Sequence, residues 1–330
     1  MHSSNIARRT FISGAAIALA GSVAAQTSAV QTFPNKPIRL IVAFPPGGST
    51  TVVARLLGQK LTERLGQPLV VDNRPGANGM IASEALVRSV PDGYTILMVV
   101  NTHAINPLIM ASLPYDTVKD FAPVSTLYKL ELVLVAHPSV AANNLREFIT
   151  LAKASPGQIN FAAGDNAGLT HLAAETFNTM AGIKIQVVPY KGTGPALSDT
   201  LAGHVQAYFS SPTAVIPHVK SGKLKAFGIS GSVRSSALPD VPTFAEAGLP
   251  GFDAGTWAGI LAPAATPREI VNKLASEISV IMNLPDIKEQ LVSQGLDSFV
   301  TTPDQFATLI KSDTARFEKI IKAANIKLEK

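Results

Sequence analysis

The sequence contains no cysteine among its 330 residues, which excludes disulfide bonds, thiolate nucleophiles and cysteine-ligated zinc or iron–sulfur centres. Charged residues are also few, at 15% of the chain. The formal net charge is only +5, and Arg8 and Arg9 near the N-terminus contribute two of the positive charges. A charge this small and this dispersed does not indicate nucleic-acid binding.

Long apolar runs are absent as well. No segment approaches the roughly 20 apolar residues that a membrane helix requires, so we expect no membrane span. The N-terminal stretch "NIARRTFISGAAIALAGSVAAQ" has paired arginines, a short apolar segment and small residues up to Ala25. We interpret residues 1–25 as a secretory signal peptide, which predicts export to the periplasm. The order Arg-Arg-Thr-Phe-Ile favours the twin-arginine route over general secretion.

Motifs for nucleotide binding and hydrolysis are missing too. No Walker string GxxxxGK[ST] occurs, and "GTGPAL" places Leu197 where the dinucleotide fingerprint needs its third glycine. The nucleophile elbow GxSxG and the zinc motif HExxH are absent. No pair of acids and no Ser-His-Asp grouping stands out. We therefore predict no catalytic residue, no metal site and no cofactor.

The sequence does contain strand-like runs that alternate with segments of helical periodicity. The runs "IRLIVAF", "PLVVDN" and "YTILMVV" form one set, and "INFAA", "IKIQVVPY" and "VQAYFS" form a second. The third run is expected to end at the polar "NTHAIN", a helix is expected at Leu145–Ala154, and two helical stretches are expected at the C-terminus. Such alternation predicts an α/β fold with parallel, doubly wound sheets. Two sets predict two lobes, the first from residues 33–130 plus 256–330 and the second from 131–255. Ligands of open α/β sheets bind beyond the carboxyl ends of strands, so we expect a ligand cleft between the lobes.

Three turns between a strand and a helix share one character. They occur at Gly47–Thr50, at Gly164–Thr170 and near Ser210–Thr213, and each combines small or hydroxyl residues with a helix N-terminus. Free backbone N–H groups and the positive end of a helix dipole suit a small anion such as a carboxylate. Any one of them alone is also explained as a simple turn. His171, which follows the second turn, either donates to a ligand or is hydrogen-bonded locally.

Longer stretches resemble a known family. They include "FPNKPIRLIVAFPPGGSTTVVARLLGQKLTERLGQPLVVDNRPGANGMIASEAL", "VPYKGTGPALSDTLAGHVQAYF", "LPDVPTFAEAGLPGF" and "WAGILAPAATP". In this order the chain resembles the tripartite tricarboxylate transporter receptors, the Bug-type periplasmic solute-binding proteins, from about Phe33 to the C-terminus. The resemblance implies a type II, venus-flytrap fold that closes on a small carboxylate. It also implies that the ligand is delivered to a separate membrane permease. We expect the protein to be a monomer.

The resemblance implies a set of ligand-binding residues in four loops. They are Phe44, Gly47, Gly48, Ser49 and Thr50 in the first loop, Asn101 and Thr102 in the second, Gly164, Asp165, Asn166 and Thr170 in the third, and Ser210 and Ser211 in the fourth. His171 is added to this set from its position beside the third loop.

This chain departs from the family pattern at three places. Thr51 stands where the family usually has Asp, and Ser210-Ser211 stand where it often has an acidic or amide residue. Asp165 and Asn166 occupy a turn that is usually small and neutral. Asp165 either lies at the helix N-terminus, where the helix dipole stabilises its negative charge, or faces the cleft. In the second case it would repel a second carboxylate and favour a ligand with an amine, amide or hydroxyl group.

The leading hypothesis is therefore an exported receptor for a small organic acid. The resemblance implies di- and tricarboxylates, aromatic acids, amino acids or nicotinic compounds as ligand classes. One alternative is a receptor that reports its ligand to a signalling partner. Another is a secreted enzyme that uses the same cleft, which the lack of a nucleophile–base pair disfavours.

Overall fold

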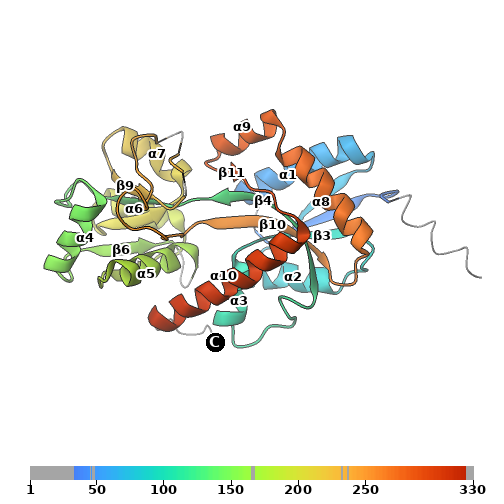
Figure 1. Ribbon diagram of the computed structural model, residues 1–330, viewed down its shortest axis with the longest axis horizontal. Coiled ribbons are helices and arrows are strands. Elements are labelled where there is room, and N and C mark those ends of the chain that lie inside the picture. Colours follow the sequence, from blue (N-terminus) through green and yellow to red (C-terminus); the bar gives the residue numbers. More distant parts are fainter. Residues whose placement is uncertain are drawn as a thin grey trace, which may run out of the picture.

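Two β-sheets, each covered by helices, lie end to end along the long axis of the molecule (Figure 1). The computed structural model describes residues 33–44, 46, 49–164, 168–231, 233–235 and 238–324. The predicted signal peptide, residues 1–25, lies outside this range. None of the helices in the described part of the chain combines the length and apolar character of a membrane span.

The first lobe is built on a six-stranded sheet of order β11-β4-β10-β3-β1-β2. Its strands are β1 (Ile38–Val42), β2 (Leu69–Asn73), β3 (Thr95–Val100), β4 (Phe121–Leu130), β10 (Thr256–Pro263) and β11 (Asp297–Ser298). Its helices are α1 (Ser49–Leu65), the 3-10 turn η1 (Ala77–Gly79), α2 (Met80–Val87), α3 (Thr102–Ile109), α8 (Arg268–Met282), α9 (Pro285–Ser293) and α10 (Pro303–Ala324).

Both faces of this sheet are buried. Alternate residues of β1 and β3, such as Leu40 and Met98, pack under α1, α8 and α9. The intervening residues, such as Ile41 and Leu97, pack under α2 and α10. Successive side chains in a strand point to opposite faces, and both faces are apolar here, so the strands read as continuous hydrophobic runs.

The second lobe is built on a five-stranded sheet of order β7-β6-β8-β5-β9. Its strands are β5 (Val133–Ala136), β6 (Asn160–Ala163), β7 (Gln186–Pro189), β8 (Ala207–Ser210) and β9 (Lys225–Ile229). Its helices are α4 (Leu145–Ala154), α5 (Leu169–Ala181), α6 (Thr193–Leu201) and α7 (Pro212–Lys220). The face under α4 and α5 is a phenylalanine cluster centred on Phe177, whose ring centroid lies within 6.1 Å of five other phenylalanine rings.

The prediction of parallel sheets is wrong in part, because both sheets are mixed. Strands β1, β2 and β3 are parallel, but β10 runs antiparallel to β3 and β4. In the second sheet β5 runs antiparallel to β8 and β9. The reason is the route of the chain. Strands β5 and β10 enter their sheets from the other lobe, so they run away from the lobe boundary while their neighbours run towards it.

Two segments cross between the lobes. The first, residues 131–132, joins β4 to β5. The second, residues 230–255, joins β9 to β10, and its middle part packs on the second lobe, where Leu238, Phe244 and Phe252 are buried. Helix α10 adds a non-covalent link, because it packs along α3 and reaches α5 of the second lobe (Figure 1). Phe317 and Ile321 of α10 share an apolar cluster with Leu172 of α5.

Two helix assignments from the sequence also need correction. The stretch "NTHAIN", expected as a polar strand end, opens helix α3, which even contains Pro107. The helix has a polar first turn and contains a proline, so the sequence did not indicate a helix. Its apolar face includes Ile105 and Ile109, which are buried. The C-terminal part has three helices, α8, α9 and α10, where two helical stretches were expected.

Candidate functional site

The four predicted loops all follow strands whose carboxyl ends lie at the lobe boundary. Loops one and two follow the paired strands β1 and β3, and loops three and four follow the paired strands β6 and β8. The end of β3 lies opposite Ala258, near the start of β10, and the end of β8 lies opposite Val133 at the start of β5. Because both partner strands begin at a crossing segment, the four loops occupy the edges by which the two lobes are joined.

In the first loop, the side chain of Asn73 holds the turn between β1 and α1. Its Nδ2 donates to the carbonyl oxygen of Phe44 at 2.8 Å and to Oγ1 of Thr51 at 3.0 Å. Thr51 is only 1% exposed, so the residue that departs from the family pattern supports the turn from within. Thr50 is buried beside it. Gly47 and Gly48 lie outside the described residues, and of Ser49 only its place at the start of α1 is described.

Asn73 was not among the predicted site residues. The only sequence signal was an asparagine at the end of "PLVVDN", in the strand that pairs with β1. A polar side chain at the end of a neighbouring strand is well placed to bond a turn at the same edge. Recognising Asn73 therefore needed the strand order, which the sequence does not provide.

The second loop contains a buried amide that has no acceptor among the described residues. Asn101 is 2% exposed, and its carbonyl oxygen accepts from the backbone N–H groups of Ala104 and Ile105 at the start of α3. Within the described part of the chain, its Nδ2 has no hydrogen-bond partner. Leaving a buried donor unsatisfied costs about 1–3 kcal/mol, so such a group indicates a site completed by something else. Thr102, the next residue, is half-buried.

The third loop is closed by a hydroxyl group. The backbone N–H of Gly164 donates to Oγ1 of Thr170 at 2.9 Å, which ties the end of β6 to the first turn of α5. Tyr208 of β8 lies against the same point, because a Cβ built on Gly164 would lie 3.1 Å from its Oη. Asp165 and Asn166 lie outside the described residues. Whether Asp165 faces the cleft stays a prediction.

His171 has a neighbouring carboxylate on its own helix. Its Nε2 lies 3.9 Å from Oε1 of Glu175, one turn further along α5, and its side chain is 13% exposed. This separation is longer than a hydrogen bond, but it brings the carboxylate close enough to attract a protonated imidazole. Which of the two expected roles His171 takes stays a prediction.

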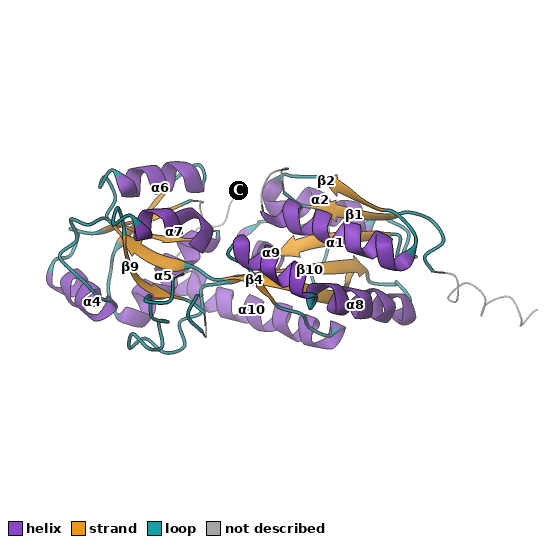
Figure 2. Cartoon of the chain, turned by 90° about the horizontal axis from the view of Figure 1, so that it is seen from above, coloured by secondary structure: helices purple, strands orange, loops and turns teal. Residues whose placement is uncertain are grey.

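The fourth loop lies where the lobes touch. Ser210 is buried at the end of β8, and Ser211 precedes Pro212 at the first position of α7 without capping the helix through its side chain. Gly295 of the first lobe approaches this helix start, since a Cβ built there would lie 3.1 Å from Cγ2 of Thr213. Figure 2 shows α7 and α9 facing each other across the boundary. No sequence motif indicated Gly295, because its close approach to α7 depends on how the two lobes pack.

The predicted residues that the structure describes offer only neutral or weakly basic donors: backbone N–H groups, hydroxyl groups, one amide and one imidazole. Within the described ranges, no group of three or more histidine or acidic residues is placed to hold a metal ion. Neutral donors at helix starts are suited to a carboxylate, which needs no metal and no lysine clamp.

The lobes, their crossings and the paired loops define a two-lobed α/β binding-protein architecture. The sequence profile of the tripartite tricarboxylate transporter family receptor matches residues 53–326. The chain is also 39% identical to Protein BugT of Bordetella pertussis over 327 residues, which is 98% of this chain and 100% of that protein. The chain belongs to the tripartite tricarboxylate transporter receptor family, whose members are substrate-binding receptors and not enzymes.

Solved structures agree with this assignment. The structure titled R. palustris Rpa4515 with adipate is 30% identical, with a TM-score of 0.77, and the match covers 90% of this chain and 100% of that one. MatC (Rpa3494) from Rhodopseudomonas palustris with bound malate is 31% identical, with a TM-score of 0.72, over 88% and 100% of the two chains. The predicted family and the predicted two-lobed fold are confirmed.

Proposed function

We propose that this protein is a periplasmic receptor that binds a small organic carboxylate between its lobes and delivers it to a tripartite tricarboxylate-type permease. The observation that carries the proposal is Asn101, whose buried Nδ2 lacks an acceptor within the described residues at the edge of the boundary. A ligand carboxylate supplies the missing acceptor. The adipate and malate in the two related structures are dicarboxylates, which supports the same ligand class here.

The proposed site consists of the four loops, with lobes formed by residues 33–130 plus 256–330 and by residues 131–255. Its residues are Phe44, Gly47, Gly48, Ser49, Thr50, Asn101, Thr102, Gly164, Asp165, Asn166, Thr170, His171, Ser210 and Ser211. Residues 1–25 direct export, by the twin-arginine route, and the exported protein acts as a monomer. Lobe closure brings donors from both sheets onto one ligand, so closure and binding are coupled.

The test is a thermal-shift screen of residues 26–330 against mono-, di-, tri- and aromatic carboxylates and amino acids. A ligand at 100 times its Kd stabilises the folded protein by about 2.7 kcal/mol, which raises the melting temperature measurably. If none of these compounds raises the melting temperature at millimolar concentration, the carboxylate-receptor proposal is wrong.

Asn101 provides a sharper test at the site itself. Asn101→Leu removes the unsatisfied donor, so we expect the unliganded protein to be as stable as the original or more stable. We expect the Kd for the best ligand to rise by about tenfold or more, because one hydrogen bond to a charged group is lost. Calorimetric titration and urea unfolding measure the two effects. Asn272→Leu, at an exposed position of α8, is the matched control. An unchanged Kd in Asn101→Leu would remove this amide from the site.

A further inference from the structure

The two crossing segments meet at one side chain, that of Glu131. Glu131 is the first residue after β4 and therefore opens the first crossing. Its Oε2 accepts a hydrogen bond from Oγ of Ser230, the first residue of the second crossing, at 2.8 Å. Ser230 Oγ in turn accepts from the backbone N–H of Leu132 at 2.9 Å. This carboxyl group and this hydroxyl group thus join the two segments by which the lobes are connected.

Glycines at both ends of the second crossing make room for this side chain. A Cβ built on Gly231 would lie 3.0 Å from Cγ of Glu131, and one built on Gly255 would lie 2.6 Å from its Oε2. Any larger residue at Gly255 would collide with the carboxyl group or with the carbonyl oxygen of Leu130, 3.0 Å away. The second crossing therefore begins and ends against Glu131.

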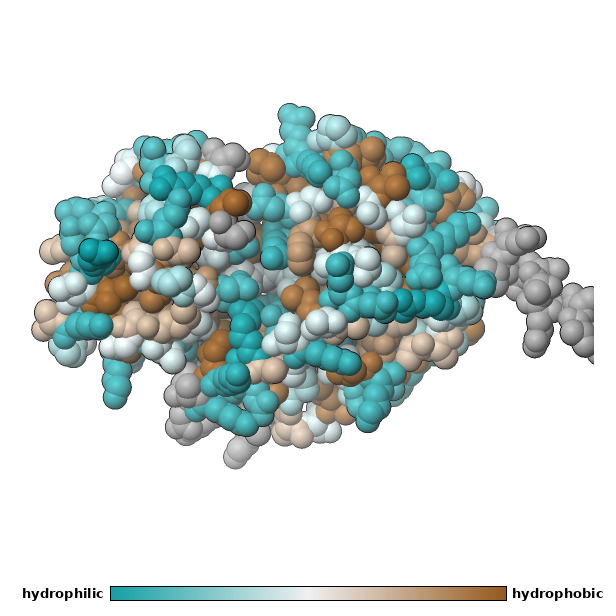
Figure 3. Space-filling model, in the orientation of Figure 1, coloured by the Kyte–Doolittle hydropathy of each residue, from teal (hydrophilic) through white to brown (hydrophobic). Residues whose placement is uncertain are grey.

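The surroundings of Glu131 belong to both lobes. A cavity of about 380 Å³ opens beside it, lined from the first lobe by residues such as Val292 and Leu296 and from the second by residues such as Pro212 and Val233. The surface is indented between the lobes beside α7 and α9 (Figure 3). The dimensions of this cavity depend on the angle between the lobes, because its walls are on opposite sides of the crossings.

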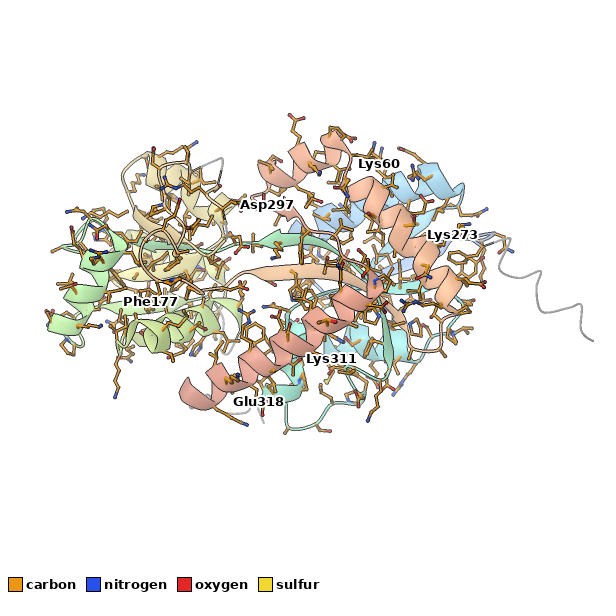
Figure 4. All side chains as sticks on the ribbon, in the orientation of Figure 1. Lys60, Phe177, Lys273, Asp297, Lys311 and Glu318 are labelled. Carbon is orange, nitrogen blue, oxygen red and sulfur yellow. The ribbon has the colours of Figure 1, made fainter. Side chains whose placement is uncertain are left out.

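Both acidic and basic side chains lie near Glu131. Asp297 of β11 lies at the boundary beside the crossing strands (Figure 4), and Asp253 belongs to the second crossing. Lys129 of β4 is the nearby cation, with its Nζ placed over the ring of Phe299. Arg316 and Arg234, the other cations here, pair with Asp253 and Glu246. Burial raises the pKa of the Glu131 carboxyl, the Ser230 hydrogen bond and Lys129 lower it, and Asp253 and Asp297 raise it further.

We propose that Glu131 is the hinge-positioning residue of this receptor: by linking the first crossing to both ends of the second, its carboxyl group sets the angle between the lobes. It does not contact the ligand in this role. It acts through the four loops, because the lobe angle determines whether donors from both sheets reach one ligand. The proposal rests on the proposed function only in its effect on affinity, since the lobe angle itself is a property of the unliganded protein.

The absence of native cysteine allows the lobe angle to be measured directly. Ser276→Cys on α8 and Thr150→Cys on α4 place one spin label on an exposed position of each lobe. Double electron–electron resonance then gives the interlobe distance distribution without ligand. Glu131→Ala and Ser230→Ala each remove the side-chain link but keep the backbone hydrogen bond from Ser230 N–H to the carbonyl oxygen of Leu132. We expect a shifted or broadened distribution for both. Glu131→Gln keeps an oxygen that accepts from Ser230, so we expect it to retain the original distribution.

Asp297→Asn is the matched control, because it removes a carboxylate from the same cavity without touching the link. The proposal is overturned if Glu131→Ala and Ser230→Ala both keep the original distribution, or if Asp297→Asn changes it as much as they do. If Glu131→Ala does not fold, the distance distribution of Ser230→Ala alone tests the proposal.

Affinity provides the second measurement. With the best ligand of the screen, we expect Glu131→Ala to raise the Kd by about tenfold, because a smaller fraction of molecules has the binding-competent lobe angle. Glu131→Gln should restore the Kd to within about twofold. If no ligand binds any variant, the proposed function fails, while the distance distributions still decide the role of Glu131.

Discussion

His103, two residues after the buried Asn101 amide, is a histidine that the fold keeps uncharged. Its Nε2 lies 2.9 Å from the carbonyl oxygen of Thr117, so Nε2 carries the proton and donates. Its Nδ1 has no partner within the described residues, and its ring meets the edge of Phe121 at a centroid distance of 4.7 Å. Burial lowers the pKa of His103 from 6.5 to about 4. Protonation would place a charge in an apolar layer beneath the second loop.

This lowered pKa predicts acid sensitivity. The unfolded chain binds a proton at His103 near pH 6.5 but the folded chain does so only near pH 4, so stability is lost as the pH falls through this range. Between pH 7 and pH 5 we expect a loss of about 2 kcal/mol from this residue. Urea unfolding at both pH values measures it. His103→Gln should flatten the difference. An equal pH dependence in the original protein and in His103→Gln would contradict the assignment.

For single residues, a sequence indicates the chemical character of a side chain more readily than its position in the fold. Hydroxyl, amide and glycine residues at strand ends indicated a carboxylate site, and Asn101 in that set is a buried donor without a described acceptor. Thr51 departs from the family pattern beside the first loop, but it is buried and accepts a hydrogen bond from Asn73. A hydroxyl group looks the same in a sequence whether it faces a ligand or a neighbouring strand. Only the packing around it separates the two roles.

At the scale of elements, the C-terminal helix α10 contacts both lobes. Asp313 accepts from Nε1 of Trp257 at 2.6 Å and from Nη2 of Arg316 at 3.1 Å, which anchors the helix to β10 beside the second crossing. Further along, Phe317 contacts the apolar cluster shared by α3 and α5. These two helices begin at the second and third loops, so α10 supports loops from both lobes.

We expect Phe317→Ala to lower the free energy of unfolding by about 3 kcal/mol, because it leaves a cavity where two lobes and α10 meet. Phe317→Leu should cost about 1 kcal/mol, since most of the volume is kept. Lys311→Ala, at an exposed position of the same helix (Figure 4), is the control and should change stability little. Guanidinium unfolding followed by circular dichroism measures all three. Equal stabilities for Phe317→Ala and Lys311→Ala would show that the cluster does not hold the lobes.

Most elements followed from local sequence patterns, and the exceptions have local reasons. The helix Leu145–Ala154 was predicted with its observed limits, and Asn144 caps it by accepting from the backbone N–H of Glu147 at 2.9 Å. Helix α3 was missed because its first turn is polar and Pro107 lies within it. Strand direction was missed for β5 and β10, because hydrophobic period is the same for parallel and antiparallel strands.

For the whole molecule, binding by closure makes a prediction that needs no mutation. Small-angle scattering of residues 26–330 should show a smaller radius of gyration with saturating ligand than without, while the scattering mass stays that of one chain. We expect the lobes to rotate about the two crossing segments, which brings the four loops together on closure. A ligand that stabilises the protein without reducing the radius of gyration would contradict closure. A doubled mass would contradict the monomer.

The sequence by itself determined the α/β alternation, the two sets of strands, the membership of a carboxylate-receptor family and the chemical character of the loops. These properties are carried by residues a few positions apart, whose periodicity and turn chemistry are local. The tertiary structure alone decided the mixed strand directions, the support of Thr51 by Asn73, the contact of Gly295 with α7, and the place of Glu131 between Ser230 and Gly255. Each of these joins segments distant in the chain, so it exists only once the lobes have folded and met.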